Sequence, residues 1–286
     1  MKGIYFEDGE NYHIKNQDIV KLIRYNDGRK IKVKNSLKHK NILENYQKLN
    51  ADEYIHKPTG EIFKYKKGKF KSKNSINRSM NKLKELLTNN FDGGNNESFI
   101  TLTYEQREEN FENAVSDSKK FWVDLKKEYQ DLEYVGVIEN QQLRCSWHIH
   151  MLIKDTKHKE LYIPSEEIER IWNKGNVDIA RITNKNIKHM VNDSTMKDNE
   201  HNAINKVIKY MCKTRSKEEI PRNKQSYHNS KGIKFPDVED RPYSEVQDVI
   251  NNYNYYLLWE NTLLIKSAST DKILNKVKEE VYKIDK

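Results

Sequence analysis

The order of apolar and polar residues in the central part of the chain alternates between strand and helix patterns. Stretches rich in β-branched and aromatic residues read as strands, whereas apolar residues spaced three to four apart read as amphipathic helices. The predicted order is strand 99–104, helix 111–129, strands 133–139 and 147–153, helix 164–174, strand 177–182 and helix 203–213. This order favours an α+β fold in which helices pack on a mainly antiparallel sheet.

The two ends of the chain have weaker patterns. Residues 1–96 form a basic N-terminal region of short segments broken by turn signals, with a helix expected over 74–90 and a linker over 92–96. Residues 216–286 form a C-terminal region that is loop-rich, could pack on the core and closes with a helix expected from Asp271 onward. The core is therefore expected to span residues 97–215.

Composition and charge restrict the class of protein. The chain has 286 residues, 35% of them hydrophobic, and its 17 tyrosines supply aromatic material for a folded core. Its 52 Lys and Arg against 43 Asp and Glu give a net charge of +9, which favours a polyanionic partner. Two cysteines and the lack of any long apolar run support neither secretion nor a membrane span. A cytoplasmic protein is expected.

A lysine-rich segment lies in the N-terminal region, at residues 64–73. Its sequence, KYKKGKFKSK, interleaves lysines with Tyr65 and Phe70, a combination that can follow a phosphate backbone while the rings stack on bases. A solvated basic loop is the alternative. The candidate DNA-binding residues here are Lys64, Lys66, Lys67 and Lys69.

Two histidines in the strand 147–153 have metal-binding spacing. His148 and His150 lie two residues apart, so they project from one face, about 7 Å apart at the backbone. Glu139 ends the preceding strand, and an antiparallel hairpin would place it beside His148. Two imidazoles and a carboxylate suit Mn²⁺ or Mg²⁺. A chance pair of surface histidines is the alternative.

Tyr210 lies at the edge of the apolar stripe of the last predicted core helix. That stripe consists of Ile204, Val207, Ile208 and Met211. Lys206 and Lys213 lie together on the flank, so packing would position the phenol while its oxygen faces cations. Lys206 and Lys209 are candidate DNA-binding residues. An ordinary boundary tyrosine beside a solvated lysine face is the alternative.

Three motifs, in this order, resemble those of the HUH endonucleases that initiate rolling-circle replication. They are Phe99–Tyr104 (FITLTY), Trp147–Leu152 (WHIHML) and the Lys209-Tyr210-x-x-Lys213 motif. Residues 171–178 (IWNKGNVD) and 227–232 (YHNSKG) also resemble replication-associated proteins of rolling-circle plasmids and phages from Gram-positive bacteria. The resemblance spans about Glu53 to Pro236.

The resemblance implies an RRM-like or ferredoxin-like nuclease core that nicks and rejoins single-stranded DNA at a replication origin. It implies that His148, His150 and Glu139 bind Mn²⁺ or Mg²⁺. Tyr210 would be the nucleophile that forms a 5′-phosphotyrosine and leaves a free 3′-OH, and Lys213 would steady the phosphate or the phenolate.

The chain departs from the family pattern one turn before Tyr210. Two-tyrosine members carry a second tyrosine there and some plasmid initiators a glutamate, whereas this chain has Lys206. How replication terminates is therefore left open. No GxxxxGK[ST] segment occurs, so a host helicase is an expected partner, together with single-stranded DNA and origin duplex.

Other functions remain to be weighed against this one. A conjugative relaxase would have a three-histidine arrangement and an N-terminal tyrosine, and a single-tyrosine transposase would be a much shorter chain. From a different class, the chain could be a non-catalytic module that binds single-stranded nucleic acid by stacking on Tyr and Phe. The sequence does not distinguish a plasmid from a phage replicon.

Overall fold

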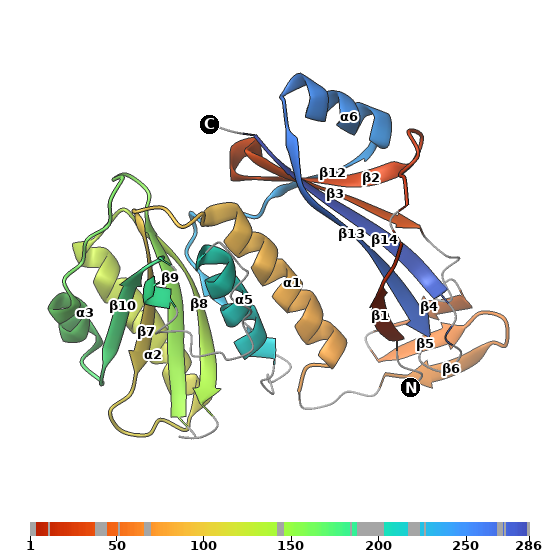
Figure 1. Ribbon diagram of the computed structural model, residues 1–286. Helices are drawn as coiled ribbons and strands as arrows, with labels where there is room; N and C mark the ends of the chain where they lie inside the picture. Colours follow the sequence, from red (N-terminus) through yellow and green to blue (C-terminus); the bar gives the residue numbers. More distant parts are fainter. Residues whose placement is uncertain are drawn as a thin grey trace. The chain divides into compact units, whose positions relative to one another are not determined.

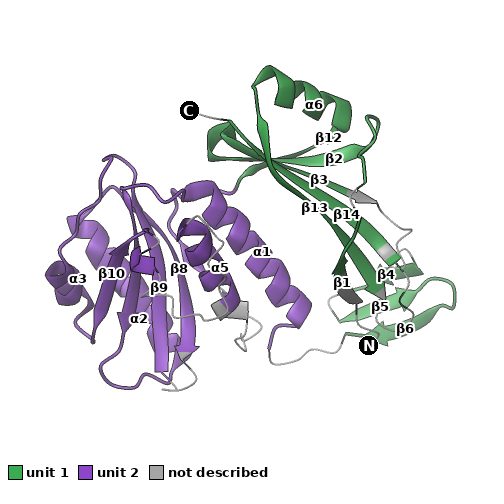
Figure 2. Ribbon diagram, in the orientation of Figure 1, with its two compact units in different colours: residues 1–67, 236–286 green, residues 68–235 purple. Residues whose placement is uncertain are grey.

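The protein divides into two compact units, which are described separately. The computed structural model describes residues 4–10, 12–37, 45–50, 52–65, 70–141, 146–183, 185–187, 203–216, 224–225, 227–267, 271 and 273–284. Unit 1 combines residues 1–67 with residues 236–286, and unit 2 comprises residues 68–235 (Figure 2). This division differs from the expected boundaries at 96 and 215, because strands from the two ends of the chain pair with each other.

Unit 2 is built on a five-stranded antiparallel sheet with strand order β10-β7-β9-β8-β11 (Figure 1). Its elements are α1 (Lys73–Asn90), β7 (Glu97–Thr103), α2 (Phe111–Glu128), β8 (Leu132–Gln141), β9 (Ser146–Asp155), α3 (Ser165–Trp172), β10 (Val177–Arg181), α5 (Ala203–Ser216) and β11 (His228–Asn229). From β7 to β10 the order is β-α-β-β-α-β, the ferredoxin-like arrangement. The predicted α+β class is confirmed.

The two faces of this sheet pack against different helices. Along β9, Ile149, Met151 and Ile153 join a buried cluster with residues of α2 and α3. Leu152 instead joins the cluster formed with α1 and α5. Alternate side chains of a strand point to opposite faces, so both faces of β9 are covered, and its first eight residues are all buried. This explains why the strand pattern is continuously apolar around its histidines.

Residues 92–96 form a loop within unit 2 and do not link two domains, which corrects the expected linker. The buried carboxylate of Glu97 accepts hydrogen bonds from the backbone amides of Asp92 and Gly93, and pairs with Lys154 at 3.4 Å. Burial is the largest influence on the pKa of Glu97, which is raised. These contacts fix α1 against the start of β7, so α1 belongs to the core unit.

Unit 1 contains a six-stranded antiparallel sheet with strand order β1-β13-β14-β3-β2-β12, and a separate three-stranded sheet, β4-β5-β6. The elements are β1 (Ile4–Asp8), β2 (Ile19–Tyr25), a short 3-10 turn η1 (Asn26–Gly28), β3 (Lys30–Leu37), β4 (Tyr46–Lys48), β5 (Glu53–His56), β6 (Glu61–Lys64), β12 (Asp237–Pro242), α6 (Tyr243–Asn252), β13 (Tyr256–Ser267) and β14 (Ile273–Lys283). Helix α6 buries Val246 and Ile250 against Val20 and Leu22 of β2.

The helix expected from Asp271 onward is wrong, because this segment is strand β14. It pairs along its length with β13 on one side and with β3 on the other. Its buried Val277 and Val281 lie four residues apart, a spacing that a helix and a strand both allow. Pairing on both edges satisfies the backbone groups of β14 and overrides local propensity.

Candidate active site

Three central strands of unit 2 bring two histidines and a glutamate into adjoining positions on one face. His148 of β9 lies opposite Glu139 of β8 and opposite Thr103 of β7. His150 lies opposite Thr101. Because opposed residues share a face, all these side chains point toward the layer of α1 and α5. The pairing of Glu139 with His148 that hairpin geometry predicted is confirmed.

Hydrogen bonds from neighbouring strands orient both imidazole rings. Nδ1 of His150 lies 3.1 Å from Oγ1 of Thr101, and Nδ1 of His148 lies 3.3 Å from Oγ1 of Thr103. Such a bond at one ring nitrogen fixes the ring and directs the other, Nε2, into the site. Sequence reasoning overlooked the two threonines, although their alternation in FITLTY is the signal that places them on the histidine face.

The carboxylate of Glu139 joins the strands to helix α5. Its Oε2 lies 2.9 Å from Nε2 of His150 and accepts a 3.1 Å hydrogen bond from the Tyr210 hydroxyl. The same hydroxyl lies 3.3 Å from Nε2 of His150. The His150 side chain is only 5% exposed, whereas that of Glu139 is 25% exposed. The three groups therefore form one cluster that solvent reaches on the glutamate side.

Packing holds the ring of Tyr210 above the sheet. Its ring meets those of His150 and Phe99 edge to face, at centroid distances of 5.2 and 6.3 Å. The predicted apolar stripe of α5 is buried against α1, as expected. Its members are Ile204, Val207, Ile208 and Met211. Helix packing on one side and ring contacts on the other thus fix where the phenol oxygen lies.

The lysines of α5 flank Tyr210 on the same helix. Lys206 and Lys213 are half-buried, and Lys209 is exposed. A correction concerns the surroundings of the phenol oxygen, which were expected to be cationic. In the structure this oxygen donates to the carboxylate of Glu139, because the strand register carries Glu139 under α5. Helix periodicity alone could not reveal a partner on another element.

The donor set suits a hard divalent metal in kind, with two imidazoles and one carboxylate on a single face. Among the described residues, however, no three His, Cys, Asp or Glu side chains converge as a ready-made metal site. The atoms that would bind an ion are partly engaged with one another, since Glu139 and His150 share a hydrogen bond. Metal binding at these residues therefore remains a proposal.

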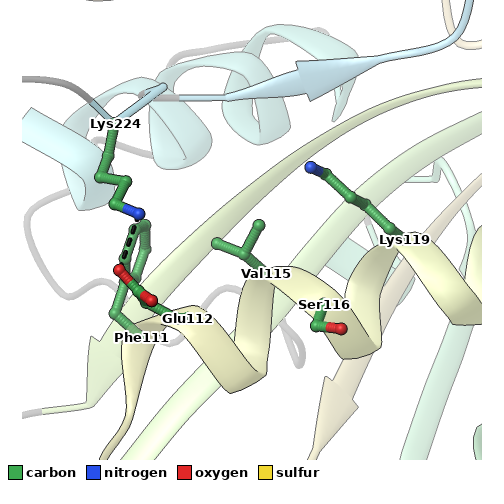
Figure 3. A pocket seen from close by; sticks show the side chains of 6 residues that line it. All are labelled: Phe111, Glu112, Val115, Ser116, Lys119 and Lys224. Carbon is green, nitrogen blue, oxygen red and sulfur yellow. Dashed lines mark ion pairs between the residues drawn. The ribbon is translucent and has the colours of Figure 1, made fainter.

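A pocket of about 270 Å³ lies elsewhere in unit 2, along the first half of α2 (Figure 3). Its lining residues are Phe111, Glu112, Val115, Ser116, Lys119 and Lys224. Glu112 and Lys224 form an ion pair at 2.7 Å across it. Both side chains are largely exposed, and such pairs contribute little stability. The pocket contains none of the histidine–glutamate–tyrosine cluster, which is assembled by packing rather than set in a cavity.

The candidate DNA-binding lysines of residues 64–73 belong mostly to a part that is not described. Lys64 is the last residue of β6 in unit 1 and is exposed. Lys66, Lys67 and Lys69 lie outside the described residues. Their predicted role therefore stays a prediction.

Comparison with known proteins bears on the strands and helices that carry the site. A family of replication-associated proteins, described under the name ORF2, matches residues 97–219. The matched range runs from β7 past α5 and contains Glu139, His148, His150, Tyr210 and Lys213. This part of the chain is similar to replication-associated proteins. No curated protein and no solved structure gives a significant match.

In the part of the chain that the structure describes, no helix is long and apolar enough to span a bilayer.

Proposed function

We propose that the chain is a rolling-circle replication initiator that nicks and rejoins single-stranded DNA at a replication origin. The observation that carries this proposal is the position of the Tyr210 hydroxyl, 3.1 Å from Glu139 and 3.3 Å from His150. This cluster lies within the range that is similar to replication-associated proteins. A phenol held against proton acceptors is suited to attack a phosphodiester.

In the proposed reaction the Tyr210 oxygen attacks the scissile phosphorus. A new bond joins the phosphorus to this oxygen, and the bond from phosphorus to the 3′ oxygen breaks. The hydroxyl proton passes to the Glu139–His150 pair, which it already contacts, and the departing 3′ oxygen takes up a proton to become a 3′-OH. The product is a 5′-phosphotyrosine, and attack on it by a 3′-OH reverses the step and rejoins the strand.

His148, His150 and Glu139 are the residues that would hold Mn²⁺ or Mg²⁺. A bound ion would neutralise the charge that develops on the non-bridging phosphate oxygens. Lys213, one helical turn beyond Tyr210, would steady the phosphate, and Lys206 and Lys209 would bind the strand nearby. Lys206 stands where a second nucleophile or a glutamate would be needed, so termination requires another group. Origin duplex and a host helicase are the proposed partners.

The test is covalent trapping on an oligonucleotide from the cognate origin. Incubated with Mn²⁺, the full chain should form a denaturation-resistant adduct with the DNA, and Tyr210→Phe should form none while still binding it. Tyr227→Phe is the matched control, because Tyr227 is also half-buried against the α1–α5 cluster. Binding without any adduct would instead identify a non-catalytic nucleic-acid-binding module.

A further inference from the structure

The three-stranded sheet β4-β5-β6 of unit 1 carries aromatic rings on one of its faces. Tyr46 lies opposite His56, and Tyr54 lies opposite Phe63. Opposed residues, and residues two apart on one strand, share a face, so these four rings lie on the same side. Tyr65, two residues beyond Phe63, extends the set. We call these five residues the ring face.

The rings of this face contact one another. Tyr54 stacks on Phe63 with ring centroids 5.4 Å apart and an interplanar angle of 18°. Tyr54 also lies 4.9 Å from Tyr65 and 5.7 Å from Tyr46, and Tyr46 lies 4.7 Å from His56. The result is one continuous aromatic surface across three strands, centred on Tyr54.

This surface does not serve a hydrophobic core. In the described part of the chain, none of the three buried core clusters includes a ring-face residue. Tyr46, Phe63 and Tyr65 are 39%, 38% and 42% exposed. Large rings that gather on an exposed surface, and that folding does not bury, mark a binding site.

The surroundings of the ring face are basic. Lys48 lies on the same face, since it is paired with Tyr54, and its side chain is exposed. Between Asn45 and Lys73 the sequence has eight lysines against three acidic residues. Lys57 and Lys64, at the ends of β5 and β6, are also exposed. This charge is complementary to phosphates and unsuited to an apolar partner.

We propose that the ring face is a stacking platform that binds single-stranded DNA separately from the Tyr210 cluster. Bases stack on the exposed rings, and Lys48, Lys57 and Lys64 pair with the phosphates between them. Every base has a π-face, so such a platform accepts any sequence, whereas in a duplex the bases are already stacked on each other. Single-stranded DNA, and not RNA, is the assigned ligand because unit 2 is similar to replication-associated proteins.

The test measures binding of the full chain to a labelled dT oligonucleotide, by fluorescence anisotropy without divalent metal so that no cleavage occurs. The double variant Phe63→Leu/Tyr65→Leu keeps apolar strand residues but removes two exposed rings. It should bind roughly tenfold more weakly or worse, the loss expected when one or more bases lose their stacking partner. Phe63→Tyr, which keeps the ring, should bind as the unaltered chain does.

Ile62→Ala is the matched control. Ile62 lies on β6 next to Phe63, points to the opposite face and is 60% exposed. The proposal predicts that it leaves dT binding unchanged, and that the double leucine variant binds a duplex of equal length as before. Equal losses in the control and the ring variant, equal losses for duplex and single strand, or tighter binding of an rU oligonucleotide than of dT would each overturn the proposal.

Photocrosslinking places the bases directly. Single-stranded DNA that carries 5-iododeoxyuridine should crosslink to peptides from residues 46–65 of the unaltered chain, and crosslinks confined to unit 2 would contradict the platform. The proposal and the nicking function fail separately. A chain that nicks normally but binds dT equally in all variants has no platform, and a chain that crosslinks here but never forms an adduct lacks the nicking activity.

Discussion

Each unit contains a carboxylate that accepts hydrogen bonds from tyrosine, but the two carboxylates are in different environments. In unit 1, Oε2 of Glu280 accepts from the hydroxyls of Tyr243 and Tyr282 at 3.0 and 2.9 Å, and Oε1 lies 3.4 Å from the ammonium of Lys278. Glu280 is only 4% exposed. In unit 2, Glu139 is more exposed, and one of its oxygens serves both His150 and Tyr210.

The difference separates a structural cluster from a reactive one. The partner of Glu280, Lys278, is itself buried and makes a second ion pair with Glu260 at 2.8 Å and a hydrogen bond to the carbonyl of Tyr12. Such a saturated network fixes the packing of strands. The cluster at Glu139 is open on one side and joins a phenol to an imidazole, which is what proton transfer to or from Tyr210 requires.

The largest expected effect is on nicking. Tyr210→Phe should reduce the rate of origin nicking by about a thousandfold or more, because the variant lacks the attacking oxygen. Tyr243→Phe removes the equivalent hydroxyl from the cluster at Glu280 and should leave the rate within about twofold. Single-turnover kinetics on the two purified variants measures both. Similar losses in both variants would erase the distinction between the clusters.

The reverse order is expected for stability. Glu280→Ala leaves the buried ammonium of Lys278 with one carboxylate fewer and should lower the free energy of unfolding by about 3 kcal/mol. Glu139→Ala removes a more exposed group and should lower it by about 1 kcal/mol. Urea denaturation, with a separate transition resolved for each unit, checks this. A larger loss for Glu139→Ala would show that the cluster in unit 2 is the structural one.

Alkaline pH should weaken unit 1 through its tyrosines. Burial, followed by the charge of Glu280, raises the pKa of Tyr243 to about 12 and also raises the pKa of Tyr282. An unfolded tyrosine titrates near pH 10, so above this pH the unfolded state loses protons first and stability falls as pH rises toward about 12. The slope of urea midpoint against pH should be shallower in Tyr243→Phe. An unchanged slope would assign the effect to other groups.

Metal binding should distinguish the clusters by a smaller shift. Saturating Mn²⁺ should raise the melting temperature of unit 2 by a few degrees, because an ion that binds only the folded state stabilises it. Replacing both histidines, in His148→Ala/His150→Ala, should abolish the shift, and Glu280→Gln should preserve it. Differential scanning calorimetry provides the measurement. A shift that survives loss of both histidines would place the ion elsewhere.

The sequence predicts the site better than it predicts unit 1, for a physical reason. The hairpin of β8 and β9 is local, so counting back from His148 was enough to place Glu139 opposite it. In α5, helical periodicity was enough to bury one face and leave Tyr210 at its edge. The contact between Tyr210 and Glu139, 71 residues apart, depends on how α5 packs on the sheet, which no local pattern encodes.

Unit 1 depends on pairing between distant parts of the chain. Strand β3 pairs with β14 near the other end of the chain, so neither strand is completed by its neighbours in sequence. The buried Lys278 and Glu280 also interrupt the apolar alternation that would have identified β14. A helix was therefore predicted in place of a strand, and two ends of the chain were assigned to separate regions although they form one unit.

Mapping the DNA-linked residue tests the central claim most directly. The chain has 17 tyrosines, so an adduct alone does not identify the nucleophile. The full chain is reacted with the origin oligonucleotide and Mn²⁺, the DNA is trimmed by nuclease, and the modified peptide is sequenced by mass spectrometry. The account predicts a nucleotide on the phenol oxygen of Tyr210, with a free 3′-OH on the released strand. A nucleotide on any other residue, or cleavage with no covalent product, would contradict it.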